Sequence, residues 1–257
     1  MILVIDIGNT NIGIGAMEDD RLLFKERIYT DLKMTPVECA ISMKNLLELN
    51  GVRPQELQGA ILSSSVPSIT GVVREAARKM VGKEVLEVGP GVKTGLDIKI
   101  DNPAQLGADL VVGAVAGIHE YGAPLVVVDL GTATSVMVVN EKRQVIGGMI
   151  LPGVGISLEA LSQRTSFLPK ISIEPPKKFI ASNTIDCMKS GIVYGAAFAI
   201  DGIVERIWDE LGQKTAVVAT GRQAKKIIPY CKTKIVTDDE LLLKGLKLVY
   251  DRNRRRN

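Results

Sequence analysis

Apolar and polar positions follow two periods along the chain, and their order predicts an α/β fold. Apolar runs of strand length occur at Ile2–Ile7, Ile12–Met17 and Leu22–Ile28, separated by short polar turns, as in successive antiparallel strands. Over Pro36–Asn50 the apolar residues recur at helical spacing, and the Gly51 that follows is a common helix-ending residue. The chain therefore starts with three strands and a helix.

The same order of elements occurs twice. Another strand and helix complete a βββαβα order in the first half, and the second half repeats it. This duplication predicts two α/β domains, residues 1–118 and 119–257, each with a mixed sheet flanked by helices. The remaining predicted strands are Gly59–Ser64, Val85–Val88, three strands between Leu125 and Ile150, and Ala216–Ala219. The remaining predicted helices are Ile69–Met80, Ala104–Ile118, Ile156–Leu161, Thr184–Leu211 (broken or bent near Gly191 and Gly195), one from Arg222, and Leu241–Tyr250.

A short polar motif follows the first strand of each half. Asp6–Gly13 reads DIGNTNIG after an apolar run, and Asp129–Thr134 reads DLGTAT after another such run, 123 residues later. At this offset Gly8 corresponds to Gly131. A single D-x-G turn could be a β-turn with an Asx cap, but two copies at matched positions favour a shared function.

The residue types of this motif suit phosphate and metal binding. An Asp that ends a buried strand can bind a cation directly or through water, and the Gly after it allows positive φ and close approach of a phosphate. Glycines in the returning strand remove side chains where a ligand could press close. The chain has neither a GxxxxGK[ST] loop nor a GxGxxG after a strand, so the fingerprints of P-loop and Rossmann nucleotide sites are missing.

Composition agrees with a globular α/β protein. Apolar residues make up 46% of the 257 residues and aromatic residues only 4%, so aliphatic residues build the core. The apolar runs have strand length, and Asp6 interrupts the first, so we expect no membrane span and no signal peptide. Three widely spaced cysteines without a CxxC motif predict reduced thiols in a cytoplasmic protein and no zinc site.

The net charge of +3 is small for a nucleic-acid-binding protein. Positive charge gathers only in a C-terminal tail with no interleaved aromatic residues, which favours a solvated terminus, and we expect no nucleic-acid partner. The tail residues are Arg252, Arg254, Arg255 and Arg256.

Asp109 is the most unusual charged residue outside the two turns. It follows Gly107 and Ala108 and precedes Leu110 in an otherwise apolar predicted helix. Its carboxylate must therefore be paired, bound to a metal or facing a cleft, unless it caps the start of the helix. An isolated carboxylate beside a glycine is what a general base for a hydroxyl substrate needs.

Other polar positions carry weaker signals. Ser63–Ser65 are explained as strand-end turn residues, because no His or acid is placed to activate them. His119 is the only histidine, and a surface position at a helix end is favoured over a Ser-His-Asp triad. Thr184 precedes an apolar helix and is either its N-cap or a ligand-binding residue.

In their order along nearly the whole chain, these motifs resemble the type III pantothenate kinases, members of the superfamily of acetate and sugar kinases, heat-shock chaperones and actin. The resemblance implies duplicated ribonuclease H-like (actin-like ATPase) domains. The motifs that carry it are DIGNTN at Asp6, SSSVP at Ser63, GPGVKTGL at Gly89, DNPAQLGAD at Asp101, DLGTAT at Asp129, GGMILPGVGISLEAL at Gly147, NTIDCMKSGIVYG at Asn183 and ATG at Ala219.

The resemblance implies transfer of the ATP γ-phosphate to the primary hydroxyl of pantothenate, which forms 4'-phosphopantothenate in the first step of coenzyme A synthesis. Asp109 is implied as the catalytic base, Asp129 as the ligand of a monovalent cation (K⁺ or NH₄⁺), and Asp6 as the residue near Mg²⁺, directly or through water. A homodimer is implied, with Thr184 reaching substrate from the partner subunit and the active site near the interface. The implied ATP-binding residues are Asp6, Ile7, Gly8, Asn9, Thr10, Asn11, Ile12, Gly13 and Thr132, and the implied substrate-binding residues are Ile100, Gly107, Ala108, Asp109, Leu110 and Thr184.

Three positions depart from the family pattern. Leu110 stands where Arg is common, Ile100 where Tyr is common, and Arg222 where a second Gly is usual. Loss of the Arg removes either a partner for the pantothenate carboxylate or a structural ion pair. Two alternatives therefore stay open: a non-catalytic nucleotide-binding regulator, and a kinase of another hydroxylated acid. The isolated carboxylates of Asp109 and the two turns argue against the regulator, because a binding module has no need of them.

Overall fold

The computed structural model describes residues 1–254, which form two compact units. The first unit comprises Met1–Leu96, Asp101–Ala116 and the chain from Glu240, and the second comprises Asp97–Ile100 and Gly117–Asp239. The expected domains, 1–118 and 119–257, stay a prediction, but contacts assign the chain from Glu240 onwards to the first unit. Two arginines of the predicted basic tail, at positions 255 and 256, lie outside the described residues.

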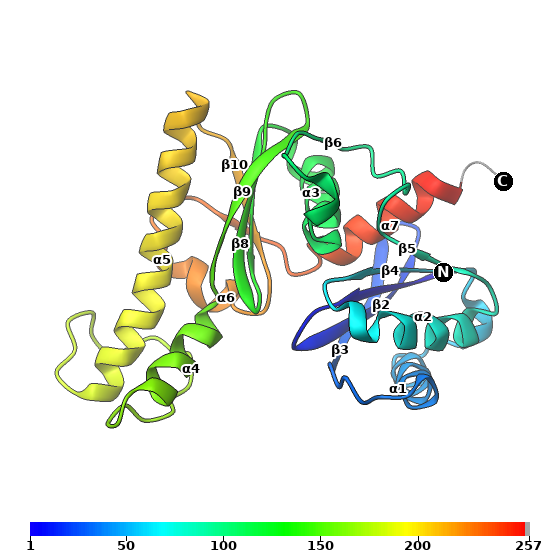
Figure 1. Ribbon diagram of the computed structural model, residues 1–257, viewed down its shortest axis with the longest axis horizontal. Helices are drawn as coiled ribbons and strands as arrows, with labels where there is room; N and C mark the ends of the chain where they lie inside the picture. The colour runs from blue at the N-terminus through cyan, green and yellow to red at the C-terminus, as the bar shows by residue number, and fades with distance from the viewer. Residues whose placement is uncertain (255–257) are drawn as a thin grey trace. The chain divides into compact units, whose positions relative to one another are not determined.

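The first unit is built on a five-stranded mixed sheet in the order β3-β2-β1-β4-β5 (Figure 1). β1, β2 and β3 pair antiparallel, whereas β1, β4 and β5 pair parallel. Three successive strands and a mixed sheet are what the sequence predicts. The bounds are β1 (Ile2–Ile7), β2 (Asn11–Glu18), β3 (Arg21–Tyr29), β4 (Ala60–Ser64) and β5 (Val85–Glu87).

Helices cover both faces of this sheet because side chains alternate along each strand. Leu3 and Ile5 of β1 pack with α1 (Pro36–Leu49) and α2 (Pro67–Val81). Val4 points to the opposite face and packs with α3 (Ala108–Tyr121) and α7 (Leu241–Arg254). By the same alternation, Asp6 is directed to the face that α3 and α7 cover.

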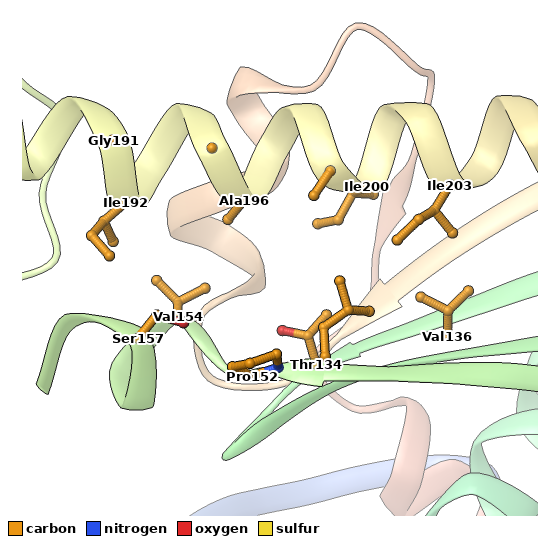
Figure 2. Close-up of a pocket in the computed structure, with 13 residues that line it drawn as sticks. Thr134, Val136, Pro152, Val154, Ser157, Gly191, Ile192, Ala196, Ile200 and Ile203 are labelled. Atoms are coloured by element: carbon orange, nitrogen blue, oxygen red, sulfur yellow. The ribbon is translucent and has the colours of Figure 1, made fainter. Parts of the chain in front are cut away.

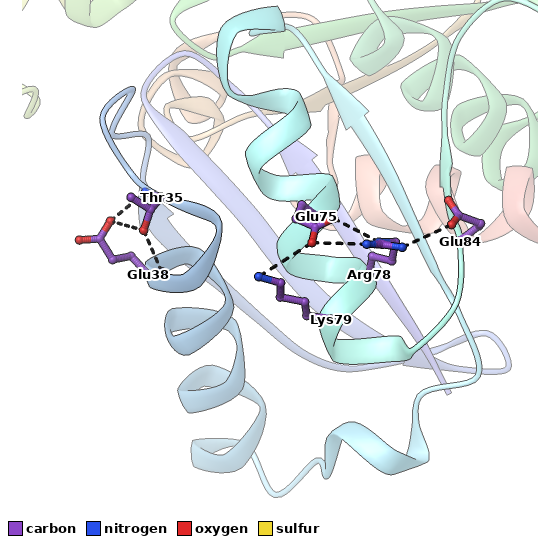
Figure 3. Close-up of polar contacts among 6 residues, drawn as sticks. All are labelled: Thr35, Glu38, Glu75, Arg78, Lys79 and Glu84. Carbon is purple, nitrogen blue, oxygen red and sulfur yellow. Dashed lines mark hydrogen bonds and ion pairs between the residues drawn. The ribbon is translucent and has the colours of Figure 1, made fainter.

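Local polar interactions cap the start of α1 and pair charges on the surface of α2 (Figure 3). Thr35 caps α1: its Oγ1 accepts from Glu38 N at 3.3 Å, and Glu38 Oε2 accepts from Thr35 N at 2.8 Å. On α2, Arg78 forms ion pairs with Glu75 at 3.1 Å and Glu84 at 3.9 Å. These pairs are solvent-exposed, so each contributes at most about 1 kcal/mol.

The second unit repeats the same topology. Its six-stranded sheet has the order β11-β10-β7-β8-β9-β6, in which β9-β8-β7-β10-β11 corresponds in pairing direction to β3-β2-β1-β4-β5. The turn between β8 and β9 carries a positive-φ residue, Arg143, as the turn between β2 and β3 does at Asp19. The duplication predicted from the sequence is therefore confirmed in the strand order. The bounds are β6 (Asp97–Ile98), β7 (Leu125–Leu130), β8 (Ala133–Val139), β9 (Gln144–Pro152), β10 (Ala216–Thr220) and β11 (Val236–Thr237).

Three helices cover one face of the second sheet: α4 (Val154–Arg164), α5 (Thr184–Leu211) and α6 (Ala224–Ile227). α5 is one unbroken helix, so of the two alternatives expected near its glycines the break is wrong, and the bend stays a prediction (Figure 1). A glycine inside a helix costs only about 1 kcal/mol, which packing of α5 on the sheet offsets. By length and hydropathy alone α5 could cross a membrane, but 44% of its apolar window is buried inside the protein, as in a core helix.

The other differences from prediction concern short elements. The helix expected from Ala104 begins at Ala108, after the 3₁₀ turn η2 (Pro103–Gln105). The two-residue strands β6 and β11 were not predicted, because two residues are too few to show a period. Two further 3₁₀ turns are η1 (Pro54–Glu56) and η3 (Ile228–Tyr230).

Candidate active site

The carboxylate of Asp6 is held at the end of β1 by a residue of the neighbouring strand. Ser63 lies opposite Asp6 in the β1–β4 register, and its Oγ donates to Asp6 Oδ1 at 2.7 Å. Ser63 is fully buried, so this bond has little competition from water. The sequence explained Ser63 only as a turn residue. Its position in β4 and its bond to Asp6 correct that expectation.

The turn after Asp6 is also fixed from a distance. Gly8 N donates to Asn11 O at 3.0 Å and closes the turn. Thr30, which is buried at the end of the β3 run, donates from Oγ1 to Gly8 O at 2.7 Å, and its N donates to Thr10 O at 3.1 Å. Sequence reasoning missed Thr30, because nothing local links it to a turn 22 residues earlier.

Burial limits how the predicted ATP-binding residues could meet a ligand. Ile7 and Ile12 have fully buried side chains, so only their backbone groups could contribute. Asn9 is exposed at the tip of the turn, and Gly8 and Thr10 are half-buried beside it. The turn therefore offers backbone donors and one exposed amide side chain.

Asp109 lies in the first turn of α3 and is half-buried. Its Oδ1 accepts from Leu110 N at 2.9 Å, so the capping role weighed from the sequence is partly right. A Cβ at Gly107 would lie 2.3 Å from Asp109 Oδ1. A glycine is therefore needed at position 107 for the carboxylate to occupy this place.

The two carboxylates of the first unit influence each other. The pKa of Asp6 is raised to about 6: burial is the largest cause and the negative charge of Asp109 adds to it, while the Ser63 hydrogen bond and the charges of Arg27 and Lys25 act in the opposite direction. Burial also raises the pKa of Asp109. The structure thus brings Asp6 and Asp109 within electrostatic reach. A divalent cation would offset both their burial and their repulsion, so the residues present fit Mg²⁺.

The second turn, at Asp129, is enclosed by glycine backbone. Asp129 ends β7 and is half-buried. A Cβ at Gly221, where φ is +92°, would lie 2.3 Å from Asp129 Oδ1. A Cβ at Gly153 would lie 2.0 Å from Thr132 O. Both positions therefore require glycine, and Thr132 is exposed at the tip of the turn.

A buried side chain beside this turn has an unused acceptor. Gln223 is 5% exposed, its N donates to Leu130 O at 3.1 Å, and its Oε1 has no hydrogen-bond partner among residues 1–254. Buried polar atoms without a hydrogen-bond partner are uncommon in folded proteins, and K⁺ binds carbonyl oxygens. By their chemistry, the Asp129 carboxylate and the unpaired Gln223 Oε1 of the same unit are oxygen ligands of the kind that fit a monovalent cation. Within residues 1–254 no group of three or more His, Cys, Asp or Glu could hold a metal ion.

A mostly apolar pocket of about 280 Å³ lies within the second unit (Figure 2). α5 forms one wall, and the opposite wall includes Thr134 of β8 and Pro152 of β9. Gly191 and Gly195 of α5 line it, so absent side chains leave part of the space. No sequence pattern indicates this pocket, because its lining is mostly apolar and comes from three separate segments of the chain.

The remaining predicted residues are spread over both units. Thr184 is the exposed first residue of α5, but the N-cap is Asn183, whose Oδ1 accepts from Asp186 N at 2.9 Å, so the capping alternative for Thr184 is wrong. Ile100 belongs to the second unit, whereas Leu110 belongs to the first.

Comparisons with known proteins agree on one family. A family model described as type III pantothenate kinase matches residues 2–206. Type III pantothenate kinases from Halalkalibacterium halodurans and Brevibacillus brevis are 44% and 45% identical over 253 residues, covering 98% of this chain and 100% and 99% of those proteins.

Solved structures with low sequence identity share the fold. The (R)-2-hydroxyglutaryl-CoA dehydratase component A from Acidaminococcus fermentans has a TM-score of 0.58 at 14% identity and covers 97% of this chain and 96% of that chain. An inorganic polyphosphate/ATP-glucomannokinase from Arthrobacter has a TM-score of 0.50 at 14% identity and covers 97% of both chains. These likenesses confirm the expected actin-like ATPase and sugar kinase fold.

Proposed function

Because the chain belongs to the type III pantothenate kinase family, we propose that it phosphorylates the primary hydroxyl of pantothenate with ATP, using Asp109 as the general base. The observation that carries this assignment of roles is the pair of half-buried, electrostatically coupled carboxylates, Asp6 and Asp109, in the first unit. Two such groups can divide the work of metal binding and proton transfer.

Asp109 suits the proton transfer. Burial raises the pKa of its carboxyl above the ordinary value, so the carboxylate holds a proton more readily than an exposed Asp does. The pantothenate hydroxyl oxygen attacks the γ-phosphorus while its proton passes to Asp109. The bond between the γ-phosphorus and the bridging oxygen breaks, and ADP leaves. Gly107, Ala108 and Leu110 line the acceptor site beside this carboxylate.

Asp6 and the turn that follows it serve ATP. Mg²⁺, held by Asp6 directly or through water, supplies charge neutralisation to the phosphates. The backbone from Ile7 to Gly13, with Asn9, contributes donors to phosphate oxygens. Thr132 of the second turn contributes a hydroxyl.

A monovalent cation, K⁺ or NH₄⁺, is assigned to Asp129. The support is the glycine-enclosed carboxylate and the buried Oε1 of Gln223 in the same unit. Replacing K⁺ by Na⁺ should lower the turnover number. It should also lower the thermal midpoint of the ligand-free protein, whereas equal values in both salts would remove the assignment.

A homodimer completes the proposal. In the second unit, large apolar side chains are exposed on β9, on α4 and α5, and on the segment between those helices, a surface typical of protein–protein contact. Among residues 1–254, β6 pairs with β9 only at Gln144 and Val145, and no other described strand pairs with that edge of β9. Thr184 is exposed at the start of α5 and would reach pantothenate from the partner subunit. The exposed side chains are Ile146, Met149, Ile150, Ile156, Leu161, Phe167, Phe179, Ile180, Ile185 and Phe198.

The test is ADP release by the purified protein with ATP, Mg²⁺ and K⁺, with and without pantothenate. We expect release that depends on pantothenate. ATP binding without such turnover would refute the proposal and favour a nucleotide-binding regulator. Turnover with a different hydroxylated acid, and not with pantothenate, would favour a kinase of that acid. We place the enzyme in the cytoplasm, where ATP is available.

The role of Asp109 is tested by Asp109→Asn, with Asp209→Asn as a control that removes the same charge from an exposed site on α5. Asp109→Asn should lower kcat about a hundredfold or more and leave ATP affinity near that of the wild type. Asp209→Asn should change neither. An unchanged kcat in Asp109→Asn would remove Asp109 from the base role.

A further inference from the structure

Three residues lie in one row across the first three strands of the first unit. Asp6 of β1 is opposite Gly13 of β2, and Gly13 is opposite Arg27 of β3. Side chains of opposed residues point to the same face of a sheet. The carboxylate of Asp6 and the guanidinium of Arg27 are therefore directed to the same face, with no side chain between them.

The space above Gly13 is open, unlike that above the next glycine of β2. A Cβ at Gly13 would meet only Asp6 O and Asp6 Cβ, at 3.8 and 3.9 Å. A Cβ at Gly15 would lie 3.0 Å from Leu243 Cδ1 of α7. α7 thus covers the sheet at Gly15 and leaves it uncovered at Gly13. In this row, the uncovered position at Gly13 lies between the carboxylate of Asp6 and the positively charged guanidinium of Arg27.

Arg27 is available for a ligand. It is exposed, and among residues 1–254 its side chain makes no ion pair or hydrogen bond, while its backbone pairs in the β2–β3 ladder. The positive charge of Arg27 nevertheless lowers the pKa of the Asp6 carboxyl. The charge of Lys25, which lies opposite Gly15, has the same effect. An unengaged guanidinium beside a site that is proposed to hold Mg²⁺ and phosphates suits phosphate oxygens, which it can bind with two parallel hydrogen bonds.

We propose that Arg27 binds the terminal phosphate oxygens of ATP above Gly13 and stabilises the charge of the phosphoryl group during transfer. The chain lacks the lysine of a P-loop, and phosphoryl transfer depends on such cationic groups. This inference rests on the proposed kinase function. The competing explanation is that Arg27 only keeps the edge strand β3 from pairing with another chain.

The experiment compares Arg27→Gln and Arg27→Lys with Arg21→Gln, a control that removes an exposed arginine from the same edge strand. Calorimetry measures Kd for a non-hydrolysable ATP analogue and for ADP, both with Mg²⁺. We expect Arg27→Gln to weaken binding of the ATP analogue about tenfold, which corresponds to about 1.4 kcal/mol, and to weaken binding of ADP less, because ADP lacks the terminal phosphate. kcat should fall about a hundredfold, the KM for pantothenate should stay near the wild-type value, and Arg27→Lys should restore part of kcat.

A purely structural role predicts a different outcome. If Arg27 only protects the strand edge, Arg27→Gln and Arg21→Gln will behave alike, with unchanged nucleotide affinity and kcat, and that result overturns the proposal. The calorimetric measurements need no acceptor. If the wild type fails to turn over pantothenate, the proposed function is refuted while the binding of the ATP analogue still decides the role of Arg27.

Discussion

Asp6→Asn tests whether the carboxylate that we propose as the Mg²⁺ ligand destabilises the ligand-free protein when it is ionised. Burial raises the pKa of Asp6 from its ordinary 3.8 to about 6. Each pKa unit corresponds to about 1.36 kcal/mol, so ionised Asp6 is disfavoured in the folded state by about 3 kcal/mol as an upper limit. Asn is neutral and keeps an oxygen that can accept the hydrogen bond from Ser63, so the substitution removes this cost with little other change.

The sign follows from proton linkage. The folded state binds the Asp6 proton more tightly than the unfolded chain, so stability falls as pH rises from about 4 to above 6. Without Mg²⁺ and nucleotide, Asp6→Asn should therefore be more stable than the wild type at pH 7.5, by about 1–3 kcal/mol. At pH 4 the difference should shrink below about 1 kcal/mol.

Thermal unfolding in the presence of a chelator measures the effect. For a chain of this size, about 1 kcal/mol shifts Tm by roughly 2–4 °C, so a gain of about 1–3 kcal/mol raises Tm by about 2–12 °C at pH 7.5. Asp20→Asn, which removes a charge from an exposed turn, serves as the control. An Asp6→Asn protein that is less stable than the wild type at pH 7.5, or equally changed at both pH values, would refute the reasoning. The variant should have lost pantothenate-dependent ADP release in either case.

Three further substitutions test packing and assembly. Gly245→Ala would place a Cβ 2.0 Å from a backbone oxygen of α3 and should lower the free energy of unfolding by about 1–3 kcal/mol, as measured by thermal unfolding. The control is Gly71→Ala, whose Cβ would meet nothing within 4 Å, and it should leave stability unchanged or raise it by up to about 1 kcal/mol. Gly153→Ala would place a Cβ 2.0 Å from the backbone of the Asp129 turn, so the KM for ATP should rise, and an unchanged KM would show that this turn does not serve ATP. Ile150 is 78% exposed on β9, and Ile150→Lys should shift the protein from dimer to monomer in analytical ultracentrifugation, while a persistent dimer would exclude this surface.

Much of the fold is visible in local patterns. β1 matches its predicted range, and β7 begins at the predicted residue, because a buried strand is a continuous apolar run whose ends are marked by Asp or Gly. α1 was predicted to within one residue, because it is amphipathic and capped at Thr35. The break considered in α5 near Gly191 and Gly195 is absent, because the helix propensity of two glycines is weaker than the burial of a long helix.

The candidate site likewise contains some residues that the sequence indicates and others that only the structure reveals. Asp6 and Asp129 stand out in the sequence, because the chemistry of a polar turn after a buried strand is local and occurs twice. Ser63, Thr30 and Arg27 do not, because their roles depend on which strand lies beside β1 or β2 and in which register. A shift of one residue in register would turn these side chains to the other face.

The sequence by itself was thus sufficient to predict the fold class, the duplication and the two acidic turns, because each of these features depends on residues that are close together in the chain. Folding alone decided that a hydroxyl 57 positions away holds Asp6, that an arginine stands across an uncovered glycine from it, and that the C-terminal helix returns to the first unit. These features arise from strand pairing and close packing between distant segments. Such contacts depend on the whole chain, and no window of sequence contains them.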